Sequence, residues 1–157
     1  MVSVETVLRW LDDVADPEIP VLSITDLGIV RGVRYDGEAL EVALTPTYSG
    51  CPATSVIRED VLRALRQHGV ENARVAVQLA PAWTTDWLSE RGRERLRAFG
   101  IAPPHPALEL GPVILGVPCP RCDSDATREQ SRFGSTPCKA LYRCDACGEP
   151  FEYVKPH

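Results

Sequence analysis

The chain has 157 residues, of which 44% are hydrophobic and 25% are charged; this ordinary globular composition excludes wholesale disorder. No apolar run approaches the roughly 20 residues that cross a bilayer, and the first residues lack the basic and apolar segments of a signal peptide. We therefore expect a cytoplasmic protein without membrane association. Thiols stay reduced in that compartment, so clustered cysteines indicate metal binding or reactivity rather than disulfides.

Charge is unevenly distributed along the chain, whose formal net charge is −5. Residues 1–118 carry 11 lysines and arginines against 16 acidic residues, whereas residues 119–157 carry 6 of each. Neither part has the positive excess that is typical of nucleic-acid binding, so we expect none. Four arginines between positions 91 and 97 form a local basic run. Because glutamates interrupt this run, we predict a solvated helix face.

Residues 1–103 are predicted to form one α+β domain. Helical periodicity indicates three helices, over residues 2–14, 52–69 and 86–99, the last capped by Thr85 or Asp86. Alternation of apolar residues indicates three strands, over residues 29–35, 39–45 and 73–79. The first two strands form a hairpin around Asp36-Gly37. The order αββαβα predicts a compact domain with a small sheet covered by helices.

Residues 104–118 are rich in proline and glycine, which predicts a connector with a short strand at residues 113–115. Residues 119–157 contain two C-x-x-C motifs separated by 21 residues, formed by Cys119, Cys122, Cys144 and Cys147. This spacing is close to that of a tetrathiolate zinc ribbon, because two intervening residues let a tight turn direct both sulfurs at one ion. Gly148 supplies the permissive backbone that such a turn needs.

We predict that residues 119–157 form a small zinc-ribbon-like domain that holds one structural zinc ion. Its large apolar residues are few, so metal binding is expected to supply much of its folding free energy; they are Phe133, Leu141, Tyr142, Phe151 and Tyr153. Iron or a cluster would accept the same four thiolates. Two redox-active C-x-x-C pairs would each need a thioredoxin-like context, which the sequence lacks. Cys138 is a fifth thiol, interpreted first as buried filler, then as a spare ligand, then as a reactive thiol.

Cys51 stands at the start of the second predicted helix, where unpaired N–H groups and the helix dipole favour a thiolate. The alternative is a small buried residue, and the residues alone do not decide between the two. Asp16, Glu18 and Asp26 are candidate carboxylates, although such residues more commonly cap loops. We find no Ser-His-Asp arrangement, phosphate loop or histidine metal motif. No catalytic residue is therefore predicted, and the chain is not expected to be an enzyme.

Four motifs together resemble the SufT-like family of iron–sulfur assembly factors over residues 3–103. They are Asp16-Pro-Glu-Ile-Pro20, Asp26-Leu-Gly-Ile-Val30, Thr45 through Gly50-Cys-Pro52, and Pro81 with Trp83. The ribbon adds Gly134-Ser-Thr-Pro-Cys-Lys139 and Glu149-Pro-Phe151. With it, essentially the whole chain resembles the PaaD subunits encoded with the bacterial phenylacetyl-CoA epoxidase, the ring 1,2-epoxidase.

The resemblance implies a fold that agrees with the αββαβα order. It also implies a role in assembling or maturing a metal centre of the oxygenase system, rather than turnover of phenylacetyl-CoA. The implied partners are a di-iron oxygenase component and a reductase component that carries flavin and an iron–sulfur cluster. The functional cysteine of the family falls on Cys51, which favours function over packing there. The wider family mostly lacks a four-cysteine tail, so the task of the ribbon does not follow from it.

The leading hypothesis is a non-catalytic assembly factor for the phenylacetyl-CoA epoxidase in aerobic phenylacetate degradation. Cys51 would be the transient contact for iron or an iron–sulfur cluster, and the ribbon would dock the client protein. Asp16, Glu18 and Asp26 would shape the loop around that contact. Two rivals stay open: a stoichiometric redox subunit with an iron site on its four cysteines, and a nucleic-acid-binding zinc ribbon. The sequence leaves open which component is the client and whether the chain forms a homodimer.

Overall fold

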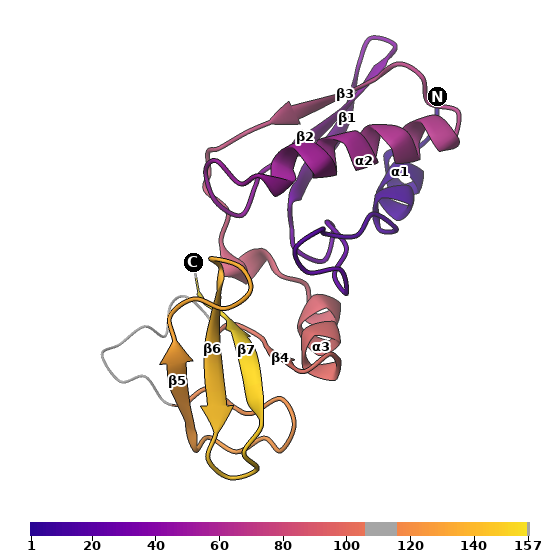
Figure 1. Cartoon of the computed structure of the whole chain (residues 1–157). Helices are drawn as coiled ribbons and strands as arrows, with labels where there is room; N and C mark the ends of the chain where they lie inside the picture. Colours follow the sequence, from indigo (N-terminus) through magenta and orange to yellow (C-terminus); the bar gives the residue numbers. More distant parts are fainter. Residues whose placement is uncertain (106–115, 157) are drawn as a thin grey trace. The chain divides into compact units, whose positions relative to one another are not determined.

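A computed structural model describes residues 1–105 and 116–156, and Figure 1 shows its elements in chain order. They are α1 (Val4–Leu11), β1 (Val30–Asp36), β2 (Ala39–Leu44), α2 (Ala53–Gln67), β3 (Ala73–Val77), the 3-10 helix η1 (Thr85–Trp87), α3 (Glu90–Ala98), β4 (Ile101–Ala102), β5 (Thr127–Ser131), β6 (Lys139–Cys144) and β7 (Pro150–Val154). The chain divides into two compact units, the first formed by Met1–Trp83 with Trp87–Gly92 and the second by Thr84–Asp86 with Arg93–His157. The strand predicted at residues 113–115 lies outside the described residues.

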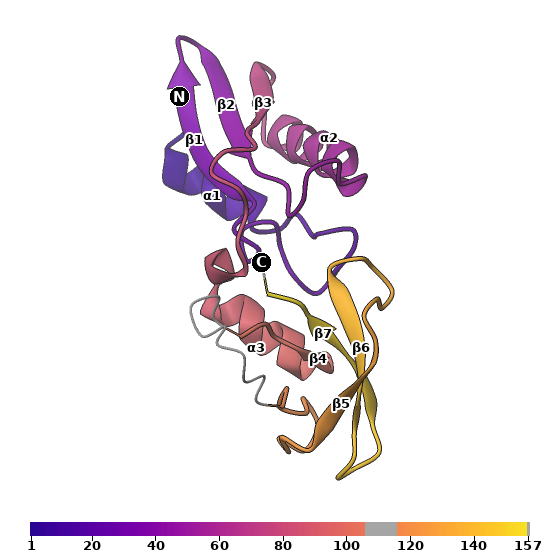
Figure 2. The ribbon, with the colours of Figure 1, turned by 90° about the vertical axis from the view of Figure 1, so that its left-hand side faces the viewer.

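The first unit is built on a three-stranded sheet in the order β1-β2-β3. β1 and β2 form the predicted antiparallel hairpin, and β3 runs parallel to β2 after the α2 crossover. Alternate side chains of β2 are fully buried on one face: Leu40, Val42 and Leu44. α1 lies against β1, α2 lies against β3, and the two helices contact each other, so they cover this apolar face (Figures 1 and 2). The predicted α+β class and element order are confirmed.

Helix α1 is shorter than the predicted helix over residues 2–14. Ser3 caps its start by accepting a hydrogen bond from the N–H of Thr6, and the helix ends at Leu11. Val14 is buried in the turn that follows rather than on the helix. Val7, Leu11 and Val14 of the predicted apolar stripe are buried, whereas Val4 and Leu8 are each 39% exposed.

The third predicted helix, over residues 86–99, is two separate elements. η1 ends at Trp87, and α3 begins only at Glu90. The Oγ of Ser89 accepts the N–H of Gly92 at 2.9 Å, so Ser89 caps α3 instead of the predicted Thr85 or Asp86. Ser89 also donates to the carboxylate of Asp26, which fixes the break between the two helices.

The second unit is built on a four-stranded sheet in the order β4-β7-β6-β5. β5, β6 and β7 form an antiparallel meander, and the two residues of β4 pair in parallel with β7 (Figure 2). Ile101–Ala102 therefore belongs to the sheet of the ribbon, whereas the sequence analysis assigned residues 1–103 to the first domain. This long-range pairing moves the start of the second unit towards the amino terminus.

The core of the ribbon is small and includes two of the four cysteines. Its members are Ala102, Val117, Cys119, Cys144, Phe151 and Tyr153, with Tyr142 packed against them. Phe133, predicted as a core residue, is instead 65% exposed and lies against the ammonium group of Lys155. None of the helices in the described ranges combines the length and apolar character that a bilayer span requires.

Candidate metal centre and reactive cysteine

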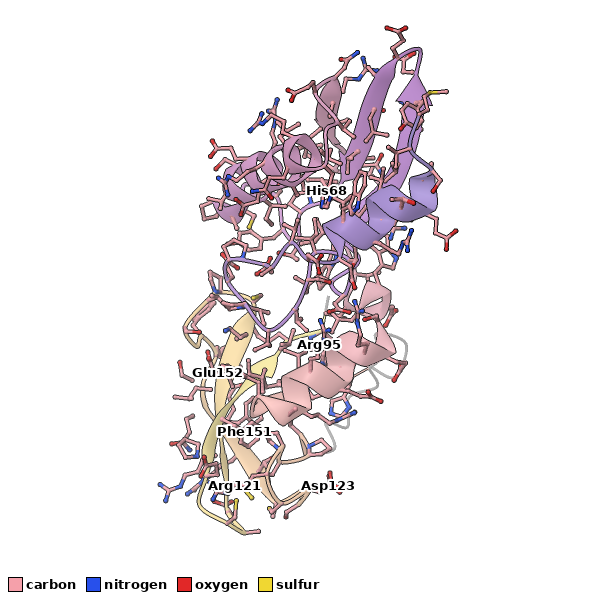
Figure 3. All side chains as sticks on the ribbon, turned by 90° about the vertical axis from the view of Figure 1, so that its right-hand side faces the viewer. His68, Arg95, Arg121, Asp123, Phe151 and Glu152 are labelled. Atoms are coloured by element: carbon pink, nitrogen blue, oxygen red, sulfur yellow. The ribbon has the colours of Figure 1, made fainter. Side chains whose placement is uncertain are left out.

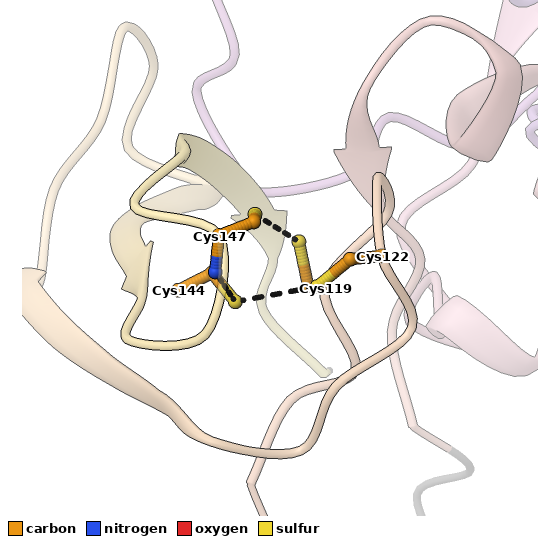
Figure 4. A group of neighbouring side chains, drawn as sticks. All are labelled: Cys119, Cys122, Cys144 and Cys147. Atoms are coloured by element: carbon orange, nitrogen blue, oxygen red, sulfur yellow. Dashed lines mark hydrogen bonds between the residues drawn. The ribbon is translucent and has the colours of Figure 1, made fainter.

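The four cysteines of the ribbon bring their sulfurs together at one point, as predicted. The Sγ atoms of Cys119 and Cys147 are 3.8 Å apart, those of Cys122 and Cys144 are 3.5 Å apart, and all four lie within 4.8 Å of one another (Figure 4). A tetrahedron with metal–sulfur bonds of about 2.3 Å has sulfur–sulfur edges of about 3.8 Å. The donor set therefore fits a single tetrahedrally coordinated metal ion.

The two knuckles that carry these cysteines have the same backbone design. In the first, the N–H of Asp123 donates to the carbonyl of Cys119, and in the second the N–H of Gly148 donates to the carbonyl of Cys144. Asp123 and Gly148 both adopt positive φ, 63° and 79°. The sequence predicted the role of Gly148 but not that of Asp123. The position of Asp123 could have predicted this role, because Asp123 and Gly148 each come four residues after the first cysteine of their knuckle.

Hydrogen bonding within the second knuckle favours a thiolate at Cys144. The backbone N–H of Cys147 points at the Sγ of Cys144, 3.5 Å away, and this donor lowers the pKa of Cys144 to about 7. Arg121, in the first knuckle, pairs with Glu149, beyond the second, at 2.9 Å, which ties the two knuckles together. Arg121 and Asp123 lie at the same end of the ribbon (Figure 3). The ribbon therefore presents four sulfurs already arranged for a metal.

Cys138 stands apart from this four-sulfur group. It is buried, and its Sγ lies 3.1 Å from the hydroxyl of Thr136. The neighbouring Lys139 is also buried and pairs with Glu152, which accepts further hydrogen bonds from Ser135. The placement of Cys138 agrees with buried filler, the first of its three interpretations.

Cys51 lies in the first unit, just before α2. It is 9% exposed, and its N–H donates to the carbonyl of Tyr48 at 3.2 Å. Pro52 takes the N-cap position of α2, and the N–H of Thr54 donates to the carbonyl of Cys51 at 3.1 Å, so the positive end of the helix dipole lies next to Cys51. Cys51 opens on a depression of about 460 Å³, whose other lining residues are Pro52, Thr54, Ser55, Arg58, Glu59, Leu62 and Val77. The residue is buried to the same extent as Cys138, but it lines a depression at a helix start, which suits transient metal contact.

Two of the three candidate carboxylates lie in the turn that stops α1. Asp16 is buried, and its Oδ1 accepts the N–H groups of Glu18 and Ile19, both at 2.8 Å. Asp16 therefore shapes the turn by capping it. Glu18 reaches the loop of Cys51, because the hydroxyl of Tyr48 donates to its carboxylate at 3.5 Å.

The third carboxylate, Asp26, anchors a segment far along the chain. Its Oδ1 accepts hydrogen bonds from Ser89 at 2.9 Å and from Arg91 at 2.8 Å. Burial alone would raise the pKa of Asp26, but these donors outweigh it and the pKa is lowered. Arg91 also pairs with Asp12, whose pKa the bound guanidinium holds far below its usual range. Arg91 is therefore a structural link, contrary to the prediction that the arginine run forms only a solvated face.

Gly28 lies in the same motif as Asp26. Only glycine fits at this position, because the backbone of Trp87 approaches it closely. It adopts a φ of 71°, and a Cβ added there would lie 2.6 Å from the carbonyl oxygen of Trp87. The indole N–H of Trp83 donates to the carbonyl of Leu27 at 2.8 Å. Both contacts lie in the first unit. The motif beginning at Asp26 therefore holds Trp83, Trp87, Ser89 and Arg91 in place, a role that the sequence did not predict.

The fold and site define a class: an iron–sulfur assembly domain followed by a four-cysteine ribbon. Residues 4–79 match the family described as iron–sulfur cluster assembly protein, and residues 104–155 match the PaaD zinc beta ribbon domain. A protein of Escherichia coli (strain K12), named as a putative subunit of 1,2-phenylacetyl-CoA epoxidase, is 50% identical over 97% of this chain and 92% of its own length. The chain belongs to this PaaD family.

Further relatives match only part of this chain. An Fe-S protein maturation auxiliary factor of Porphyromonas gingivalis is 35% identical over 55% of this chain and 83% of its own length. The crystal structure of a domain of unknown function, DUF59, from Bacillus anthracis has a TM-score of 0.55 and 28% identity, covering 59% of this chain and 90% of that one. A conserved hypothetical protein of Thermotoga maritima has a TM-score of 0.51 and 32% identity, covering 60% and 94%.

Proposed function

We propose that this chain is a non-catalytic maturation factor that delivers iron or an iron–sulfur cluster to a component of the phenylacetyl-CoA epoxidase system. One observation carries the proposal. The assembly-type fold places a lone thiol, Cys51, at a helix start and at the mouth of a depression. The relatives named as Fe-S maturation factors support the activity, and the relative named as an epoxidase subunit supports the system.

Delivery at Cys51 is a ligand exchange without change of oxidation state. A thiol of the client binds the iron as a thiolate, the bond from the iron to the Sγ of Cys51 breaks, and the released Cys51 thiolate takes up the proton. The first turn of α2 stabilises the negative charge of the released thiolate until it takes up the proton. Asp16 contributes by holding the neighbouring turn, and Glu18 by its contact with Tyr48. Asp26 acts further away, by fixing Ser89 and Arg91.

The ribbon has a different task in this proposal. Its four thiolates would hold one zinc ion, which supplies cross-linking and folding free energy to a core of few apolar residues. The folded ribbon would then serve as a rigid surface for docking the oxygenase or reductase component. Iron in the same site would give a redox subunit instead. Metal analysis and a visible spectrum of anaerobically purified protein separate the two, because zinc–thiolate sites are colourless and iron–thiolate sites absorb visible light.

The proposal is tested by replacing the wild-type copy with Cys51→Ser in cells grown on phenylacetate. Serine is a poor ligand for soft iron centres because its hydroxyl is hard and stays protonated. We expect folded variant protein, no growth, and iron-deficient epoxidase components. Cys138→Ser is the matched control and should support growth. Normal growth of the Cys51→Ser strain, with fully metallated components, would refute the proposal.

A further inference from the structure

Strand β3 leaves one side of its backbone open at the edge of the first sheet. The sheet order β1-β2-β3 gives β3 a neighbouring strand on one side only. The N–H of Leu40 in β2 donates to the carbonyl of Asn72, and alternate residues of a strand bond to the same side. The backbone N–H and C=O groups of the even-numbered residues therefore point towards β2. Those of Ala73, Val75 and Val77 point outward, at the open edge.

This edge lacks the features that normally discourage strand addition. β1 is bulged between Val30 and Gly32, and β5 is bulged between Glu129 and Ser131, which disrupts pairing at those edges. β3 has no proline and no bulge, and it keeps an unbroken register over its five residues. Its single charged residue, Arg74, is held on the sheet face by ion pairs to β1 and β2. Its backbone is therefore available to an added strand.

The open edge ends beside Cys51. Val77, the last residue of β3, also lines the depression at Cys51. Parallel β2 and β3 place both of their carboxyl ends at this side of the sheet, so the loop that carries Cys51 and the end of β3 meet. Val77 is 44% exposed, and Leu79 beyond it is 58% exposed. The lining also holds one cation, Arg58, and one acidic residue, Glu59, between which the described ranges show no ion pair.

We propose that the open edge of β3 binds an extended segment of the client protein, the segment that carries cysteine ligands for its iron centre. This inference rests on the proposed function. Ligand exchange needs the incoming sulfur and the Sγ of Cys51 on one iron, so the client backbone must come close to Cys51. Strand addition on β3 supplies backbone hydrogen bonds for affinity, and its alternate side chains reach the depression. Arg58 complements the negative charge of client thiolates.

Amide hydrogen exchange measured residue by residue tests the docking. The probes are the purified reductase component and, separately, the oxygenase component, each prepared without iron. One of them should slow exchange of the outward amides of Val75 and Val77, while the inward amide of Ala76 is already protected by β2. Unchanged exchange of Val75 and Val77 with both components would overturn the proposal. So would protection in the free protein that rises with its concentration, because a second copy would then occupy the edge.

Two variants at Val77 separate the contribution of the backbone N–H to component binding from the contribution of the side chain. Val77→Pro removes an outward N–H and leaves the bonds to β2 intact, which an edge strand tolerates. It should weaken component binding about tenfold, and Val77→Thr, which keeps the N–H, by less than about threefold. Equal loss in both variants would contradict strand addition. Cys51→Ser should retain the protection while abolishing maturation. If Cys51→Ser matures the client normally, the proposed function fails whereas the docking result stands.

Discussion

Asp123 and Gly148 occupy equivalent positions, each four residues after the first cysteine of its knuckle and each with positive φ, 63° and 79°. Glycine adopts this conformation readily, whereas a residue with a Cβ is strained by about 1–2 kcal/mol, less for aspartate. The two knuckles therefore differ in backbone strain while sharing their hydrogen bonds. This difference can be measured through metal affinity, because metal binding is coupled to folding of the ribbon.

Gly148→Ala should weaken zinc binding and Asp123→Gly should strengthen it. Apart from its chain neighbours, no described residue comes within 4 Å of a Cβ added at Gly148, so the cost is conformational, about 1 kcal/mol or a five- to tenfold loss of affinity. By the same reasoning, Asp123→Gly relieves backbone strain and should raise the affinity for zinc a few-fold. Competition with a chelator measures both. Asp125→Gly is the control for the loss of an aspartate, and an equal gain there would contradict the strain at Asp123.

Loss of one ribbon cysteine should unfold the second unit and spare the first. Cys122→Ser and Cys144→Ser each remove a ligand, and the remaining apolar core is too small to stabilise the ribbon. Because β4 pairs with β7, the loss should spread back to Ile101 rather than stop at the predicted boundary. NMR spectra should lose dispersed signals for residues 119–156. Stoichiometric zinc with an intact ribbon in both variants would refute this assignment, and Cys138→Ser should retain metal.

Arg91→Met should destabilise the first unit most strongly near neutral pH. Asp26 is fully buried and Arg91 about half exposed, so we expect a loss of about 2 kcal/mol, below the value for a fully buried pair. The pKa values of Asp12 and Asp26 are both lowered in the folded protein. Their stabilisation is therefore present above the ordinary carboxyl pKa near 4 and is lost as the pH falls through the lowered values.

The measurement is urea unfolding followed by tryptophan fluorescence at pH 7 and pH 3. All three tryptophans lie in the first unit, so the signal reports that unit alone. The wild type should lose more stability than Arg91→Met between the two pH values. The control is Arg66→Met, at an exposed position of α2 in the same unit. A pH dependence of Arg91→Met equal to that of the wild type would show that Arg91 does not stabilise the two carboxylates.

Local patterns in the sequence predicted most of the fold and the metal site. Periodicity identified the elements of the first unit, and the C-x-x-C spacing brought four sulfurs together because each knuckle is a local turn. Contacts between distant segments had no such signal. Arg91 and Asp12 are 79 residues apart, and the two-residue β4 carries no strand pattern of its own. Only the folded chain shows that Asp26 and Ser89 together interrupt the third helix.

Delivery of iron by Cys51 is tested most directly by anaerobic transfer of isotopically labelled iron. Wild-type protein loaded with labelled iron and sulfide is mixed with each iron-free epoxidase component, and the label on the component is measured after separation. We predict that the wild type transfers labelled iron, whereas Cys51→Ser transfers no more than a control with free labelled iron. The stability of Cys51→Ser should stay within about 1–2 kcal/mol of wild type, and its ribbon should retain its metal. Equal transfer from Cys51→Ser would contradict the role of Cys51.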